Sequence, residues 1–87
     1  MAVFRTVLEA TGGNNVGLPV PEDVLLSFGR GKRVPVIVTI DGGYTYKNTI
    51  GVLGGRPFIS FNAETRKNTG RGAGDEVDVE LIVDPDR

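Results

Sequence analysis

Residues 34–50 decide the fold, and they read VPVIVTI (34–40), DGG (41–43) and YTYKNTI (44–50). The first segment is rich in β-branched residues, which favour an extended strand. The turn segment suits a tight hairpin, because Asp and Gly tolerate the positive φ angles that such turns need. The third segment alternates, with Tyr44 and Tyr46 on one face and Thr45 and Lys47 on the other. We therefore predict an antiparallel hairpin.

The apolar run of residues 34–40 is nearly continuous, which predicts a strand buried on both faces. Pro35 lacks a backbone N–H and predicts a bulge or a sheet edge near the start of this strand. Pro19 predicts, for the same reason, that the short extended segment 16–20 is confined to an edge.

Three further segments are predicted to form strands. Residues 2–10 alternate, with Phe4 and Leu8 on the inner face, and residues 76–83 alternate with Val77 inward. Residues 58–61 are expected to form a short strand after a Gly-rich connection over residues 51–57.

Two helices of about two turns are predicted, over residues 21–29 and 62–70. Pro21 suits a first turn, Asn62 is a good N-cap, and a glycine ends each segment. Helices this short cannot cover a parallel sheet. The element order therefore predicts a mainly β fold, a small closed or half-closed β-barrel capped by two short helices, with residues 1–87 as a single domain.

The chain has no His and no Cys, so it offers no imidazole base and no thiolate nucleophile. The five glycine-rich residues 70–74 lie between a helix and a strand, whereas phosphate-binding loops lie between a strand and a helix. Asp75 is expected to accept hydrogen bonds from nearby loop amides, and Asp41 to form a turn. We therefore expect no enzyme, no cofactor and no metal site.

Charge is segregated along the chain. Residues 30–71 carry eight basic and two acidic residues, whereas residues 72–87 carry one basic and six acidic residues. This asymmetry is typical either of a surface for anionic ligands or of an acidic last strand that pairs with basic neighbours. The candidate binding residues, for a protein partner or a small anionic ligand, are Tyr44, Tyr46, Lys47, Arg56, Asn62, Arg66 and Lys67.

Nucleic acid is the alternative partner, because strand aromatics with cations hold single strands on other small barrels. The acidic pI of about 5.3 argues against it. The start of the chain has no signal-peptide shape and no apolar run approaches 18 residues, so we expect a cytoplasmic protein without a membrane span. A homodimer stays open as a way to bury more surface.

The sequence resembles the family named domain of unknown function 1905 over about residues 3–83. The resemblance implies a double-split β-barrel, similar in shape to transition-state regulators and antitoxins that bind DNA, and some relatives are fused to a bacteriocin-protection domain. It implies no catalytic residue. The matching elements are Leu18-Pro19 with Glu22, Arg33-Val34-Pro35-Val36, Asp41-Gly42, Asn62, Arg66-Lys67 with Gly70, and Gly74-Asp75 with Val77.

Overall fold

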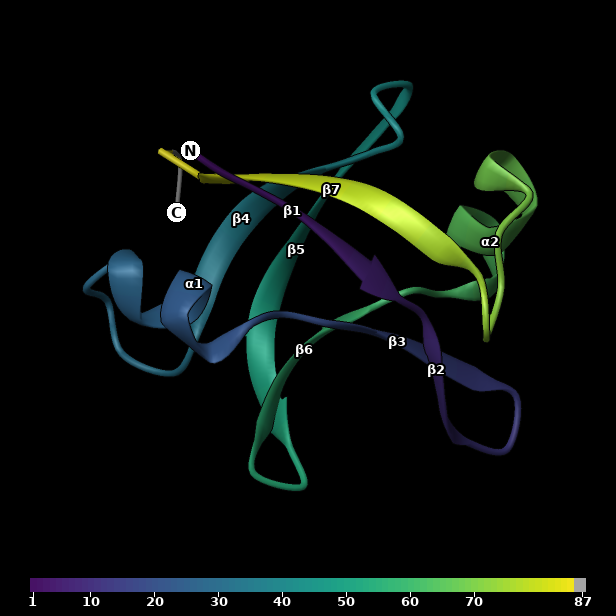
Figure 1. The fold of residues 1–87 in the computed structure, drawn as a ribbon, viewed down its shortest axis with the longest axis horizontal. Coiled ribbons are helices and arrows are strands. Elements are labelled where there is room, and N and C mark those ends of the chain that lie inside the picture. Colours follow the sequence, from purple (N-terminus) through teal and green to yellow (C-terminus); the bar gives the residue numbers. More distant parts are fainter. Residues whose placement is uncertain (86–87) are drawn as a thin grey trace.

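The computed structural model describes residues 1–85. Within these residues it contains seven strands and two short helices (Figure 1). The strands are β1 (Ala2–Val7), β2 (Glu9–Gly12), β3 (Asn15–Pro19), β4 (Val34–Ile40), β5 (Tyr44–Leu53), β6 (Arg56–Ser60) and β7 (Glu76–Val83). The helices are α1 (Glu22–Ser27) and α2 (Ala63–Thr69).

All strand pairs are antiparallel, in the order β1-β7-β4-β5-β6-β3-β2. The first and last strands of this order are consecutive in the chain and are separated only by Leu8, so the sheet curls until its two edges meet (Figure 1). Leu8 N donates to Asp75 O at 2.9 Å, and Gly74 N donates to Leu8 O at 2.8 Å. The prediction of a mainly β, barrel-like fold is confirmed at this level.

The core fills the inside of the curled sheet. In β4, Val34, Val36, Val38 and Ile40 are buried, whereas the residues between them are only partly buried. The expected burial of both faces of this strand is therefore wrong, because a single curled sheet has one enclosed face. The inward residues of β7, led by Val77, are buried as predicted.

Both prolines lie in interior strands, so the predicted edges are wrong. β4 lies between β5 and β7 without a bulge, and β3 lies between β6 and β2. Val20 N donates to Pro57 O, so Val20 faces β6 and the nitrogen of the preceding Pro19 points to the opposite side, toward β2. β2 does not reach that position, because its pairing with β3 ends at Gly17. Pro19 is tolerated because its nitrogen faces a place where β2 has already ended. Pro35 lies opposite Asp84, one residue beyond the end of β7, and accepts a hydrogen bond from Asp84 N without donating one.

Two predicted boundaries also differ from the structure. The strand over residues 2–10 is interrupted at Leu8 and continues as β2 to Gly12. The predicted connection 51–57 is instead the end of β5, a turn at Gly54 and Gly55, and the start of β6. Both turn glycines have positive φ angles, 60° and 79°, so a tight turn replaces the longer loop.

The helices end where the capping residues predict. The side chain of Asn62 accepts a hydrogen bond from Thr65 N at 2.9 Å, and Gly70 ends α2 with φ of 69°. In α1, Leu25 is buried and Gly29 has φ of 64°. Within residues 1–85, neither helix is long and apolar enough to cross a membrane.

Candidate functional site

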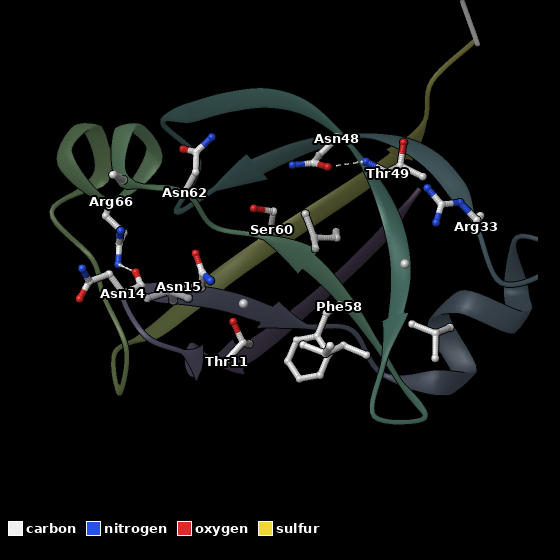
Figure 2. Close-up of a pocket in the computed structure, with 17 residues that line it drawn as sticks. Thr11, Asn14, Asn15, Arg33, Asn48, Thr49, Phe58, Ser60, Asn62 and Arg66 are labelled. Carbon is white, nitrogen blue, oxygen red and sulfur yellow. Dashed lines mark hydrogen bonds between the residues drawn. The ribbon is translucent and has the colours of Figure 1, made fainter.

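The sheet divides between β5 and β6. The first part of β5, up to Ile50, pairs with β4, and only Gly51–Leu53 pair with β6. β6 in turn pairs with β3 from Phe58 onward. Beyond Gly51 and Phe58 the two strands therefore diverge from their common hairpin, and we call the space between them the fork (Figure 2).

A hollow of about 610 Å³ occupies the fork and the surface beside it (Figure 2). Its lining comes from the β2–β3 hairpin, from β5 and β6, from the start of α2 and from the loop before β4. The polar side chains that line it are Thr11, Asn14, Asn15, Arg33, Asn48, Thr49, Ser60, Asn62 and Arg66.

One wall of the hollow is aromatic and tightly packed. A Cβ atom built on Gly17 would lie 2.8 Å from Cδ1 of Phe58 and 2.7 Å from Cγ2 of Thr11, so only glycine leaves room for both side chains. The guanidinium carbon of Arg56 lies 5.2 Å from the centre of the Phe58 ring. The phenyl ring is thus held in place by backbone, methyl and cation contacts.

Side chains hold the backbone where the fork opens. Asn48 Oδ1 accepts a hydrogen bond from Thr49 N at 2.7 Å, and the hydroxyl of Tyr46 donates to Ser60 O at 3.1 Å. Burial raises the pKa of Tyr46, and the nearby Tyr44 adds to the shift, so this hydroxyl stays protonated and remains a donor.

The hollow is positively charged. Arg33 and Arg66 line it, and none of its lining residues is acidic. Nη1 of Arg66 donates to the carbonyl oxygen of Asn14 at 2.8 Å, which fixes the side chain and leaves its other N–H groups for a ligand. An arginine carries its charge at any physiological pH, so the hollow has two permanent cations.

The structure divides the predicted binding residues between several places. Asn62 and Arg66 line the hollow. Tyr44 and Tyr46 pack against each other with ring centres 5.9 Å apart, and Nδ2 of Asn68 lies 3.4 Å from the Tyr44 hydroxyl. Neither tyrosine lines the hollow.

The other predicted cations lie elsewhere. Lys47 is exposed on the outer side of β5, with Nζ 3.9 Å from Oδ2 of Asp84. Arg56 forms a two-contact ion pair with Glu9, at 2.9 and 3.2 Å. Lys67 is exposed on α2, outside the hollow. The seven residues therefore do not share one face.

Sequence reasoning missed most of the hollow. Arg33 and Asn14 are not among the predicted binding residues, and nothing in the local sequence connects them. One signal was present in Asn48, a polar residue on the otherwise apolar or aromatic face of the strand 44–50.

Several charges outside the hollow are paired. Arg5 contacts Glu76 and Asp78 at 2.8 Å each, so the expected pairing of the acidic last strand with a basic neighbour is confirmed there. Gly72 N donates to Oδ2 of Asp75 at 2.8 Å, as predicted for a loop carboxylate. Arg71 contacts Asp41 at 3.1 Å.

Comparison with known proteins identifies a family. No curated protein matches the chain. The family model described as "Domain of unknown function (DUF1905)" matches residues 4–81. This span contains every strand and helix apart from the ends of β1 and β7, and the chain therefore belongs to this family.

Proposed function

We propose that this protein is a non-enzymatic binding module that holds an anionic group in the hollow of the fork. The observation that carries the proposal is the composition of the lining, which includes two arginines and four asparagines but no carboxylate. In a chain with slightly more acidic than basic residues, an acid-free hollow of this size concentrates positive potential at one place.

The lining has the chemistry to bind an anion. A guanidinium presents a planar set of donors that matches a carboxylate or a phosphate, and asparagine amides add further donors and acceptors. The hollow offers no pairing of a nucleophile with a general base, because its one serine, Ser60, has no ionisable base among the lining residues. These features favour recognition over catalysis.

We further propose that the curled sheet is a double-split β-barrel, with the fork as one of its splits. The change of partner along β5 and β6 supports this assignment.

Single-stranded nucleic acid is a second candidate, in line with the DNA-binding barrels of similar shape. It is favoured by the phenyl ring of Phe58, which lines the same hollow as Arg33 and Arg66. The packing of both tyrosines outside the hollow argues against it, because a stacking surface would need them exposed.

The test compares two neighbouring cations of one helix. Amide NMR spectra are recorded while inorganic phosphate is added to the wild type, Arg66→Gln and Lys67→Gln. We expect phosphate to shift the amides around the hollow, and Arg66→Gln to weaken binding about tenfold, since a charge-assisted hydrogen bond contributes roughly 1.5–3 kcal/mol. Lys67→Gln is the matched control and should leave binding unchanged.

A third variant separates charge from structure. Asn62→Asp keeps a good N-cap on α2 and places a carboxylate in the hollow, so it should abolish phosphate binding without loss of stability. Equal weakening by Arg66→Gln and Lys67→Gln would contradict the proposal, because it would mean general attraction to surface charge. Shifts with single-stranded DNA that spread over Lys47 and Lys67, with steep salt dependence, would favour the second candidate.

A further inference from the structure

The two arginines of the hollow come from different elements and lie at its opposite ends. Arg66, on α2, is held at the β2–β3 turn by its contact with the carbonyl oxygen of Asn14 at 2.8 Å. Arg33 lies in the loop before β4, beside the point where β5 begins to pair with β6. Figure 2 shows Arg66 at one end of the hollow and Arg33 at the other.

The strand register sets the separation of these two ends. Paired residues form a row across β5, β6 and β3, namely Gly51, Phe58 and Pro19. Arg33 lies next to the β5 end of this row, since its neighbour Val34 stands opposite Ile50. Arg66 contacts Asn14, which precedes the β3 end of the row by five residues. A strand rises about 3.3 Å per residue, so the two ends lie roughly 15 Å apart along the strands. A single carboxylate or phosphate group therefore contacts one arginine and not both.

The groups between the two arginines are neutral side chains that form hydrogen bonds. Figure 2 shows Asn48, Ser60 and Asn62 in this middle part of the hollow. The Oδ1 atoms of Asn48 and Asn62 accept hydrogen bonds from Thr49 N at 2.7 Å and from Thr65 N at 2.9 Å. Each amide is thereby oriented and keeps its Nδ2 as a donor, and a serine hydroxyl both donates and accepts. The middle part therefore suits an uncharged body that carries hydroxyl and carbonyl oxygens.

This distribution of charge selects among elongated anions. A nucleic-acid strand carries a negative charge at every unit, whereas the cations that line the hollow, within residues 1–85, are confined to its two ends. A peptide strand would need main-chain partners, and Thr49 N in the middle part is already bonded to Asn48. A chain of sugars meets both conditions, because amide and hydroxyl side chains match sugar hydroxyls and acidic sugars can alternate with neutral ones.

We propose that the hollow binds an acidic oligosaccharide in which two carboxylates are separated by a neutral sugar. One carboxylate contacts Arg66, whose side chain is fixed, and the other contacts Arg33, which only a long ligand reaches at the same time. The volume of about 610 Å³ lies within the range of about 300–1,000 Å³ for small-ligand sites. The inference rests on the anion-binding function proposed above and specifies its ligand.

The test compares three sugars by amide NMR titration of the wild type. The hyaluronan disaccharide carries one carboxylate, the hyaluronan tetrasaccharide carries two with a neutral sugar between them, and chitotetraose carries none. We expect the tetrasaccharide to bind about tenfold or more tightly than the disaccharide, because it gains a second charge-assisted contact within one molecule. Chitotetraose should bind more weakly than either.

Two neighbouring cations of one loop provide the matched variants. Arg33→Gln should reduce the affinity for the tetrasaccharide to that for the disaccharide, and it should leave the disaccharide and inorganic phosphate unchanged, because both bind at Arg66. Lys32→Gln is the control, since Lys32 is exposed and does not line the hollow. Arg33 is itself exposed, so its substitution removes no buried side chain. The comparison of the three sugars on the wild type gives its answer independently of both variants.

The outcomes separate this inference from the function on which it rests. Phosphate binding together with equal affinity for the disaccharide and the tetrasaccharide would overturn the two-ended site and leave the anion site intact. Equal weakening of the tetrasaccharide by Arg33→Gln and Lys32→Gln would do the same. Failure of phosphate and of all three sugars would overturn both proposals. Tighter binding of a thymidine trinucleotide than of the tetrasaccharide would identify a nucleic-acid strand as the ligand and reject the oligosaccharide.

Discussion

Gly17 is the residue on which the aromatic wall of the hollow depends. It is not held in a left-handed conformation, so its requirement is one of space alone. A methyl group there would meet Phe58 and Thr11 at less than 3.0 Å. Since both neighbours are side chains packed against the sheet, the ring of Phe58 has to move if Gly17 gains any side chain.

We predict that Gly17→Ala lowers the free energy of unfolding by about 1–3 kcal/mol, the usual range for overpacking. Gly51→Ala is the matched control, because Gly51 also lies in a strand and a Cβ there meets nothing within 4 Å. Urea unfolding of the three proteins measures the difference. Equal stability of Gly17→Ala and Gly51→Ala would show that the Phe58 ring yields freely and that the wall is not rigid.

At the scale of elements, charge joins the first and last strands of the chain, β1 and β7, which are neighbours in the sheet. Arg5 on β1 contacts Glu76 and Asp78 on β7 across a regular ladder. The hydrogen bond and charge of Arg5 lower the pKa of Asp78 below its usual value of 3.8. A carboxyl group with a lowered pKa stabilises the fold above its unfolded-state pKa and loses that contribution as the pH falls through the lowered value.

We therefore predict that Arg5→Gln raises the pKa of Asp78 toward 3.8. The wild type should be more stable than the variant at pH 7, and the difference should shrink as the pH falls below about 3.8. Carboxyl-carbon NMR titration and urea unfolding at several pH values measure both effects. Arg56→Gln, which breaks the pair with Glu9 in the other part of the sheet, should leave Asp78 unchanged. An identical Asp78 titration in wild type and Arg5→Gln would rule out this coupling.

Elements set by local signals could be predicted from the sequence. Asn62 and Gly70 mark the ends of α2, and the alternation around Val77 places β7 correctly. Pro35 led to a wrong prediction. Whether a proline fits there depends on where β7 ends, and the end of β7 lies about fifty residues further along the chain. The fork also depends on pairing between distant segments. The local sequence of β5 gives only one sign of its change of partner, the polar residue Asn48.

In the candidate site, too, residues with a local sequence signal were predicted and residues without one were not. Asn62 and Arg66 were found because they belong to a polar helix with recognisable caps. Arg33 was missed because it reaches the hollow only through the pairing of β4 with β5, in which the next residue, Val34, stands opposite Ile50. The tyrosines and Lys47 were grouped by composition, whereas alternation along β5 places Lys47 on the opposite side of the strand.

At the scale of the whole molecule, the sheet is held together where its two edges meet. Leu8 is 1% exposed, and both its N–H and its carbonyl bond to residues just before β7. The chain on one side of Leu8 pairs with β7, and the chain on the other side pairs with β3. The core on the inside is shared by both parts, so loss of packing at Leu8 should weaken the two parts together.

We predict that Leu8→Ala lowers the free energy of unfolding by about 2–5 kcal/mol, as expected for a fully buried leucine. Val3→Ala is the control, because Val3 lies on β1 but is 66% exposed, and it should change stability by less than about 0.5 kcal/mol. Amide hydrogen exchange should show equal loss of protection in the β1–β7 and β3–β6 ladders of Leu8→Ala, since two parts that share one core unfold as one unit. Loss of protection confined to β1 and β7, with β3 and β6 unchanged, would mean that the two parts of the sheet are independently stable and that their meeting at Leu8 does not couple them.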